Sequence, residues 1–317
     1  MAFANVSDLV TTTIERRSKK IANNVLGHNA VLAKLSASGK VKTFSGGTKI
    51  YEELSFAQNG NAGFYSGYDT LPVAPQDVIS AAEYQIKQAA CPVIVSGLEQ
   101  LINSGPDAFI DLVESRMSVA EDTMKNLITG SIYSNGTQSG GKELDGLGKL
   151  VVDAPGTGSV GGIDPATWAF WQNKVTSAAA TDSPTMLAKL NAIWPTLVRG
   201  ADQPDLIILG TTYWGYYLGA LQPLQRFQSD SSAGAGFPSL KYMNNVDVVF
   251  DNVAGLSATK GYILNSKYLK FRPHQDRNFT SLDPKKRYAI NQDAEVQILA
   301  FAGNLTMSGR QFQGKVI

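Results

Sequence analysis

The glycines between residues 156 and 161 have the spacing of a cofactor-binding motif. Gly156, Gly158 and Gly161 fit the pattern G-x-G-x-x-G and follow the strand-like KLVVD, as in dinucleotide-binding proteins. In those proteins the third glycine opens a helix whose amides bind a pyrophosphate. Here Pro155 precedes the pattern and Pro165 follows it closely, so no helix is expected at that point. We interpret the loop as an ordinary connection and predict no cofactor.

Residues that ligate metals or act as nucleophiles are scarce. The chain has two histidines, His28 and His274, and one cysteine, Cys91. They match no known metal-site spacing, and no G-x-S-x-G nucleophile elbow is present. Cys91 lies in the apolar run AACPVIV, so we interpret it as a small packed side chain. The sequence therefore predicts no catalytic residue and no metal site.

Two neighbouring carboxylates, Glu52 and Glu53, could in principle form an acid–base pair. They fall in a predicted strand, where adjacent side chains point to opposite faces. We therefore interpret both as solvated charges.

A basic cluster near the N-terminus consists of Arg16, Arg17, Lys19 and Lys20. It is not interleaved with aromatic residues, as a binder of single-stranded nucleic acid would be. Two interpretations stay open: a solvated face, or an arm that faces nucleic acid or an acidic partner.

Composition limits the classes of protein that this chain can be. It has 317 residues, 43% of them apolar, with 28 Lys plus Arg against 27 Asp plus Glu and a net charge of +1. Such a chain folds, but a protein whose main task was to grip phosphates would be more basic. No segment approaches the roughly 20 apolar residues that span a bilayer.

The first forty residues are polar and mildly basic, and they read as an arm that lies on another surface. Residues 43–96 are predicted to form two long strands around a loop. In KIYEELSFAQ, Ile50, Leu54 and Phe56 share one face, and DVISAAEYQIKQAACPVIVS returns with a period of two. A lone ribbon of this kind is marginal in water, so it should find a partner surface.

The loop of this ribbon carries three aromatic residues, Phe64, Tyr65 and Tyr68, among glycines. A monomer would expose them, and aromatic side chains are enriched at buried protein interfaces. We predict an interface here, with local packing as the alternative.

A long helix follows, beginning at Pro106 and predicted to stop at Gly130. Its apolar stripe comprises Phe109, Leu112, Val113, Met117, Ala120, Met124, Leu127 and Ile128. Further helices are predicted over 165–178, 184–198 and 212–221. DLIILG is typical of a buried strand, NNVDVVFDN, KGYILN and YLKFRP read as strands, and two closing strands are expected around Ala302–Asn304.

This order of elements resembles the major capsid proteins of tailed double-stranded DNA bacteriophages. The Gly-rich TGSIYSNGTQSGGKELDGLGKLV after the long helix and the closing INQDAEVQILAFAGNLTMSGRQFQG are similar to segments of that family. The resemblance implies the Hong Kong 97-type fold, an α+β fold with five parts. These are an N-arm (1–42), an E-loop (43–92), a P-domain with its spine helix (93–150 and 104–130), an A-domain (151–272) and closing P-domain strands (273–317).

The resemblance also implies a function. Hexamers and pentamers would assemble in the host bacterial cytoplasm into an icosahedral virion shell around double-stranded DNA, with a portal and, in some relatives, scaffolding or cement proteins. No membrane would be involved, and DNA contacts would be weak and non-specific. The implied subunit interface comprises Lys49, Glu52, Glu53, Phe64, Tyr65 and Tyr68, and the implied lumen-facing arm comprises Arg16, Arg17, Lys19 and Lys20.

Two departures from the family lead to further expectations. Some relatives join subunits covalently through an E-loop lysine, but the segment from Gln58 to Pro75 has no lysine and Lys49 lies near the ribbon base. We expect no covalent cross-linking. Some relatives also begin with a cleaved scaffolding region, whereas the arm starts here almost at Met1, so we expect no N-terminal processing.

Two other hypotheses remain. An encapsulin-like nanocompartment shell shares the fold but encloses cargo enzymes, and the long arm and ribbon favour the phage interpretation over it. An α/β enzyme that uses the Gly156–Gly161 loop is the third and weakest hypothesis.

Overall fold

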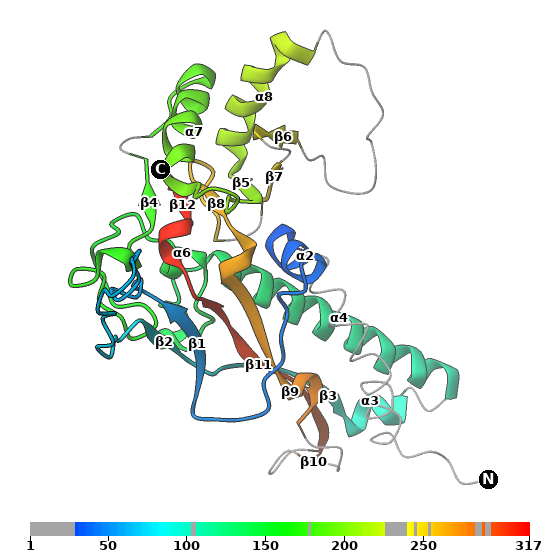
Figure 1. Ribbon diagram of the computed structural model, residues 1–317. Helices are drawn as coiled ribbons and strands as arrows, with labels where there is room; N and C mark the ends of the chain where they lie inside the picture. The colour runs from blue at the N-terminus through cyan, green and yellow to red at the C-terminus, as the bar shows by residue number, and fades with distance from the viewer. Residues whose placement is uncertain are drawn as a thin grey trace.

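The computed structural model describes residues 29–102, 106–176, 179–225, 240–243, 246–252, 255–282, 287–288 and 293–317, and of residues 100–102, 106–114, 222–225, 287–288 and 295 only the backbone. The described chain is α+β and contains three sheets (Figure 1). One has two strands, in the order β1-β2. The second joins β10, β11 and β3, with β9 also paired to β11, and the third has the order β4-β12-β8-β5-β7-β6.

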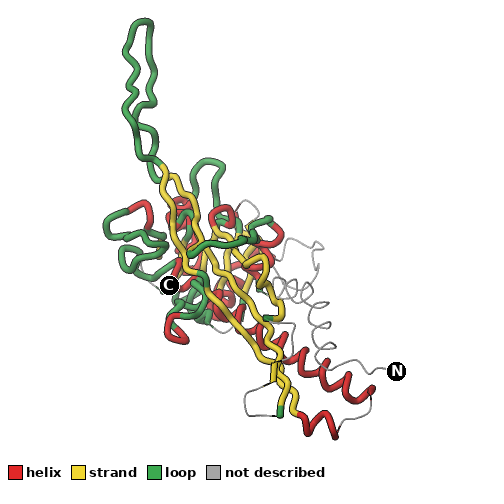
Figure 2. The backbone as a smooth tube through the Cα atoms, turned by 90° about the horizontal axis from the view of Figure 1, so that it is seen from below, coloured by secondary structure: helices red, strands yellow, loops and turns green. Residues whose placement is uncertain are grey.

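The two-stranded sheet is the base of the predicted ribbon. Its antiparallel strands β1 (Lys49–Ser55) and β2 (Ile79–Gln85) pair along their whole length. Alternate residues of β1 are buried, so the predicted period of two is confirmed. Beyond the strands, residues 56–78 form a narrow loop that projects away from the rest of the molecule (Figure 2).

The second sheet consists of β3 (Lys87–Ser96), β9 (Leu269–Ser281), β10 (Arg287–Tyr288) and β11 (Ala294–Met307). The prediction of two strands around Ala302–Asn304 is wrong, because β11 runs through that point without a turn. It pairs with β3 on one side up to Gly303 and with β9 on the other. A Cβ on Gly303 would lie 2.7 Å from the carbonyl oxygen of Arg272, so this glycine permits close strand approach and does not make a turn.

The long helix α4 (Pro106–Tyr133) follows the short α3 (Gly97–Ile102) and packs on β3. Met117, Met124 and Ile128 of the predicted stripe are buried, as is Ala120. Leu127 is a correction, because it faces outward and is 52% exposed.

The predicted stop of this helix at Gly130 is also wrong. Ile132 and Tyr133 continue the buried face, and their packing carries the helix one turn further than the glycine predicts. The side chains of Phe109, Leu112 and Val113 lie outside the described residues.

The third sheet comprises β4 (Lys174–Val175), β5 (Leu206–Leu209), β6 (Leu240–Tyr242), β7 (Val246–Phe250), β8 (Gly261–Leu264) and β12 (Gly314–Val316). Helices α7 (Ser183–Leu197) and α8 (Thr211–Gln225) pack on each other and against this sheet, and both were predicted. Asp182 caps α7 by accepting a bond from the backbone N–H of Thr185, while Thr185 bonds back to the N–H of Asp182.

The helix predicted over 165–178 does not form. Its place is taken by the short η1 (Ala169–Trp171) and by strand β4. Trp171 is buried and donates its indole N–H to the carbonyl of Val160, while Asn173 bonds both backbone groups of Val152. The hydrogen bonds of these side chains hold the segment as an irregular loop, although its local sequence favours a helix.

The predicted boundary between residues 272 and 273 stays a prediction. Strand β12 lies within the third sheet, between β4 and β8, although the prediction grouped residues 273–317 together. The absence of a side chain at Gly314 lets Leu197 of α7 approach, since a Cβ there would lie 2.7 Å from the leucine Cδ1.

The remaining short elements are α2 (Ala30–Ala37), α5 (Gln138–Gly141), α6 (Leu147–Leu150), η3 (Ser266–Tyr268) and η4 (Arg310–Phe312).

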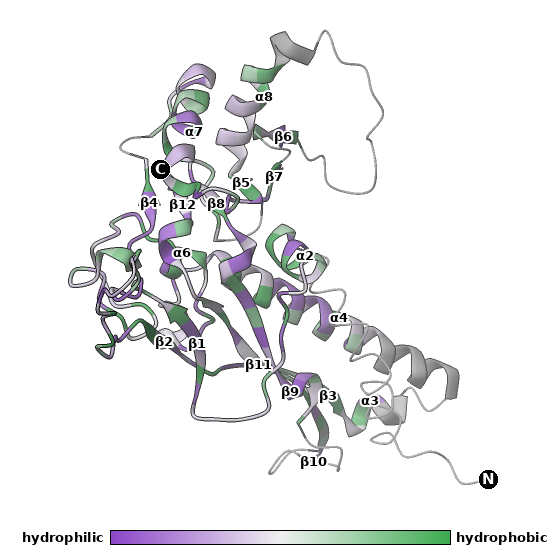
Figure 3. Ribbon diagram, in the orientation of Figure 1, coloured by the Kyte–Doolittle hydropathy of each residue, from purple (hydrophilic) through white to green (hydrophobic). Residues whose placement is uncertain are grey.

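Two apolar cores result. The larger joins α2, α4, the ribbon base and strands β9 and β11, and the smaller lies between the third sheet and helices α7 and α8. Apolar and polar residues accordingly alternate along helices such as α2 and α7 (Figure 3). None of the described helices is both long and apolar enough to cross a membrane.

Candidate assembly surface

The ribbon tip, residues 57–77, exposes apolar side chains that a stable monomer would bury. Phe64 and Tyr68 are fully exposed, and Tyr65 is 66% exposed. The exposure expected for a monomer is therefore confirmed, whereas the role of these residues at a subunit interface stays a prediction. Burying one large aromatic or aliphatic side chain contributes about 1.5–3 kcal/mol, so covering this tip would contribute substantially to association.

Polar bonds hold the two arms of the tip together. The amide of Asn61 donates to the carbonyl of Ala74 across the ribbon. The carboxylate of Asp69 accepts a bond of 2.8 Å from the backbone N–H of Ser66. Because these bonds shape the tip without burying its aromatic residues, its apolar surface stays available to a partner.

At the ribbon base, Glu52 departs from its predicted place as a solvated charge at a subunit interface. Its side chain is 3% exposed, is ion-paired with Lys270 and lies 3.4 Å from the Nε of Arg272. The hydroxyl of Thr306 donates a bond of 3.0 Å to Oε1 of Glu52, the oxygen that faces Arg272. Glu52 is thus an intrachain anchor. The strand period already places it on the buried face with Ile50, which is the signal that would have found it.

Two further contacts attach the ribbon base to β11. The hydroxyl of Tyr84 donates a bond of 2.8 Å to the carbonyl of Met307, and burial raises the pKa of this tyrosine. The amide of Asn304 donates bonds of 2.9 Å to the carbonyl of Gln85 and of 2.8 Å to the carboxylate of Asp145. The direction of the ribbon is therefore set by buried hydrogen bonds at its root.

The other predicted charges of the ribbon lie on its outer face. Lys49 forms an exposed ion pair with Glu83, and hydrogen bonding to this carboxylate raises the pKa of the lysine. Glu53 is exposed at the rim of a cleft that also contains Arg199. The predicted basic arm, comprising Arg16, Arg17, Lys19 and Lys20, lies outside the described residues.

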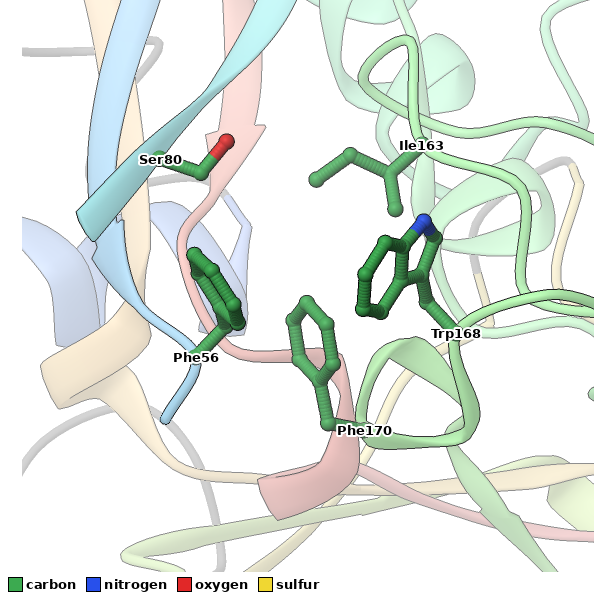
Figure 4. Close-up of a pocket in the computed structure, with 5 residues that line it drawn as sticks. All are labelled: Phe56, Ser80, Ile163, Trp168 and Phe170. Carbon is green, nitrogen blue, oxygen red and sulfur yellow. The ribbon is translucent and has the colours of Figure 1, made fainter. Parts of the chain in front are cut away.

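An apolar cavity of about 130 Å³ opens beside the ribbon base, and no pattern in the sequence predicted it. Four of the five residues that line it are aromatic or aliphatic and point toward one another (Figure 4). They are Phe56, Ser80, Ile163, Trp168 and Phe170. The rings of Phe56 and Phe170 stack with centroids 5.7 Å apart, and Trp168 meets both edge-on.

A second cleft of about 250 Å³ adjoins this cavity at Phe170. Tyr268 and Phe312 stack in its wall with centroids 4.3 Å apart, and the guanidinium of Arg199 lies 5.3 Å from the Phe312 ring. We call the cavity and cleft together the aromatic groove. Its residues come from six separate segments, so sequence spacing alone could not assemble it.

The residues considered for chemistry form no reaction centre in the described part of the chain. No group of three or more His, Cys, Asp or Glu side chains that could hold a metal occurs there. Cys91 is partly buried on β3, and burial raises the pKa of its thiol. His274 packs edge-on against Phe44 with centroids 4.9 Å apart, and His28 lies outside the described residues.

The glycine loop is structural. No helix opens at Gly161, whose positive φ of 63° and missing side chain let it lie against the ribbon base. A Cβ there would lie 2.9 Å from that of Ala82, and its carbonyl accepts a 2.9 Å bond from the backbone N–H of Glu83. The interpretation as a connection agrees with this packing.

No family model matches the chain, and no curated protein matches it. Solved structures with similar folds include phage capsid chains. The cyanophage A-1(L) capsid subunit matches with a TM-score of 0.62 at 18% identity, covering 87% of this chain and 89% of that one. The capsid of the native GTA particle gives 0.56 at 12% identity with 89% of each chain covered, and Mycobacterium phage Bobi gives 0.51 at 12% identity, also with 89% of each. The chain therefore has the phage capsid fold, the Hong Kong 97-type α+β fold that its sequence predicts.

Proposed function

We propose that this protein is a shell-forming subunit, the major capsid protein of a tailed phage. Copies assemble as hexamers and pentamers into an icosahedral head that encloses double-stranded DNA. The observation that carries the proposal is the ribbon: a capsid fold projects a loop whose aromatic side chains are exposed and whose root is fixed by buried polar bonds. Its role is structural and not catalytic.

Assembly follows from the physics of that loop. A projecting ribbon with an apolar tip gains free energy only when it lies on another surface, and its fixed root directs it to one place on a neighbour. Many such contacts of modest strength add to a stable shell through avidity. The family resemblance further suggests a portal, scaffolding or cement proteins as partners, weak contacts to packaged DNA, and a place in the virion after assembly in the host cytoplasm.

Expression of the full chain alone, followed by sedimentation and electron microscopy, tests the proposal. We expect closed shells of uniform size, and a stable soluble monomer at high concentration would contradict it. Particles isolated from an infected host should contain nuclease-protected DNA. Particles that contain protein cargo and no genome would instead indicate an encapsulin-like shell.

A variant of the ribbon tip tests whether its exposed aromatic residues are needed for assembly. Replacing Phe64, Tyr65 and Tyr68 with serine should abolish shells while changing thermal unfolding of the subunit little, because Phe64 and Tyr68 are fully exposed and Tyr65 is largely exposed. Replacing the exposed Ser115, Ser118 and Asn126 of α4 with alanine is the matched control for a triple surface change.

A further inference from the structure

Two asparagines of this chain are followed directly by glycine. One pair is Asn59–Gly60 in the ribbon tip, and the other is Asn135–Gly136 after α4. In such a pair the backbone nitrogen of the glycine can attack the carbon of the asparagine side-chain amide and close a succinimide ring. Glycine has no Cβ to obstruct the attack, and its backbone reaches the required conformation at little cost. Whether the reaction occurs in the folded chain therefore depends on how free that nitrogen is.

At the ribbon tip the attacking nitrogen is free. Asn59 and Gly60 are both exposed and lie outside the helices and strands, on the loop that projects from the molecule (Figure 2). The backbone N–H of Gly60 has no hydrogen-bond partner in the described part of the chain. Solvent can therefore remove its proton, and this step makes the amide nitrogen nucleophilic.

The side chain of Asn59 is held close to that nitrogen. Its Oδ1 accepts a bond of 3.0 Å from the backbone N–H of Asn61, and its backbone carbonyl accepts one of 3.1 Å from the N–H of Ala62. The first bond is an Asx turn, which curls the side-chain amide back over the intervening peptide of Gly60. The same N–H stabilises negative charge on Oδ1 while the amide carbon is attacked, as an oxyanion-hole donor does.

The second pair shares this turn but lacks the free nitrogen. Oδ1 of Asn135 accepts bonds from the backbone N–H and from the hydroxyl of Thr137. The N–H of Gly136, however, donates a bond of 3.1 Å to the hydroxyl oxygen of Ser134. Gly136 is buried with a φ of 72°, and a Cβ on it would lie 3.4 Å from a carboxylate oxygen of Asp145. Ring closure here would require breaking a buried hydrogen bond and opening a packed turn.

We propose that Asn59 is a site of spontaneous modification, which converts through a succinimide to aspartate and isoaspartate, and that the fold protects Asn135 from the same reaction. In the first step a bond forms between the Gly60 nitrogen and the side-chain carbon of Asn59. The bond from that carbon to Nδ2 breaks, and the proton lost by the Gly60 nitrogen leaves in ammonia. In the second step water adds to either carbonyl carbon of the ring and opens it, so each product gains a carboxylate without any oxidant or reductant.

Both products alter the ribbon tip. Residues 58–78 contain Asp69 and Asp77 and no lysine, arginine or histidine, so a further carboxylate adds to a surface that is already acidic. Isoaspartate in addition carries the backbone through the former side-chain carbon, and a longer backbone then replaces the turn that Oδ1 closes. This inference goes beyond the proposed function and does not depend on it, because the contacts that carry it lie within a single chain.

Peptide mapping of the purified full chain tests the assignment. The chain is incubated in mildly alkaline buffer at a concentration at which sedimentation shows unassembled subunit, and fragmentation locates each residue that gains the mass of an amide-to-acid change. Enzymatic methylation of isoaspartate gives an independent readout. We expect conversion to be at least about tenfold faster at Asn59 than at Asn135, because reaction at the second site requires a buried hydrogen bond to break first. Equal rates, or faster conversion at Asn135, overturn the proposal.

Unfolding the chain separates the effect of the fold from that of the neighbouring sequence. In denaturant the bond between Gly136 and Ser134 is lost, so Asn59 and Asn135 should convert at similar rates. A difference that persists in denaturant would show that local sequence decides the rates, and it would overturn protection by the fold.

Two glycine variants of the exposed tip test the attacking atom. Gly60→Ala should slow conversion at Asn59 severalfold, because the added Cβ obstructs the nitrogen. That Cβ would lie 3.4 Å from the side-chain oxygen of Gln76, an ordinary contact, so the tip keeps its shape. Gly63→Ala is the matched control and should leave the rate unchanged, since no atom lies within 4 Å of its added Cβ. Equal conversion at Asn59 in both variants contradicts attack by the Gly60 nitrogen.

Discussion

Asn304 of β11 donates a hydrogen bond of 2.8 Å to the carboxylate of Asp145, and its own carbonyl oxygen accepts one of 2.9 Å from the backbone N–H of Asp145. Its amide also donates to the carbonyl of Gln85, at the end of the ribbon strand β2. One fully buried side chain therefore joins the ribbon root, the central strand and the loop that follows α4.

Replacing Asn304 with alanine should lower the free energy of unfolding by roughly 2–3 kcal/mol, because it leaves the buried N–H of Asp145 and the partly buried carbonyl of Gln85 without this partner. Chemical denaturation of the subunit measures this loss. Asn126→Ala, on the exposed face of α4, should change stability by less than about 0.5 kcal/mol. Equal stability of the two variants would show that water replaces the amide of Asn304.

Replacing Glu52 with glutamine should be strongly destabilising, because the change leaves the partly buried cations of Lys270 and Arg272 without their carboxylate. Removing one partner of a buried ion pair typically costs about 3–5 kcal/mol. Denaturant titration checks the value, and shells of this variant should be fewer because the ribbon root is looser. Glu53→Gln, one residue along and exposed, is the matched control. An equally small effect of both substitutions would contradict the role of Glu52 as an anchor.

The stability of the subunit should fall steeply in alkaline solution. Burial raises the pKa of Tyr217 and of Tyr242 from an ordinary 10.0 to about 12, and it raises the pKa values of Tyr84 and Tyr262 further. The folded chain keeps these protons after the unfolded chain has lost them. This stability is therefore complete below pH 10 and is lost as pH rises through 12. Burial lowers the pKa of Arg310 to about 10, which opposes the loss, but the tyrosines whose pKa is raised outnumber this one arginine.

Thermal unfolding followed from pH 8 to pH 12 measures this dependence. Tyr217→Phe removes one of the titrating hydroxyls, which donates a 3.0 Å bond to the carbonyl of Lys241, and should make the alkaline slope shallower. Phenylalanine at the exposed Tyr51 should leave the slope unchanged. A flat profile up to pH 12 would contradict the burial of these hydroxyls.

Mature particles should give a single monomer band on a denaturing gel. The ribbon tip has no lysine, and Lys49 at its base is ion-paired with Glu83 in the same chain. A ladder that survives boiling and reduction would show covalent joining and would require another lysine as its donor.

Sequence periodicity correctly predicted the helices and strands in which the spacing of apolar residues matches the buried face. The ribbon strands, α7, α8 and the buried strand β5 all follow from local spacing, because period and burial agree within each segment. The exposed aromatic residues of the tip were recognisable for the same reason, since a glycine-rich loop offers them no local cover.

Where local signals and packing disagreed, packing prevailed. Gly130 lies inside α4 because Ile132 and Tyr133 gain more from burial than the glycine costs, and β11 passes Gly303 because both of its neighbours pair there. The helix predicted over 165–178 gave way to a loop pinned by Trp171.

The amino-acid sequence by itself thus determined the α+β class, the projecting ribbon and the absence of a recognisable catalytic motif. Only the tertiary structure decided which groups the buried Glu52 anchors, because its cationic partners are more than two hundred residues away. The aromatic groove likewise exists only after distant segments meet, since Phe56, Trp168 and Phe312 share no local pattern. Contacts between residues remote in sequence give no periodic pattern along the chain. The candidate assembly surface is built from such contacts, so the sequence could not predict it.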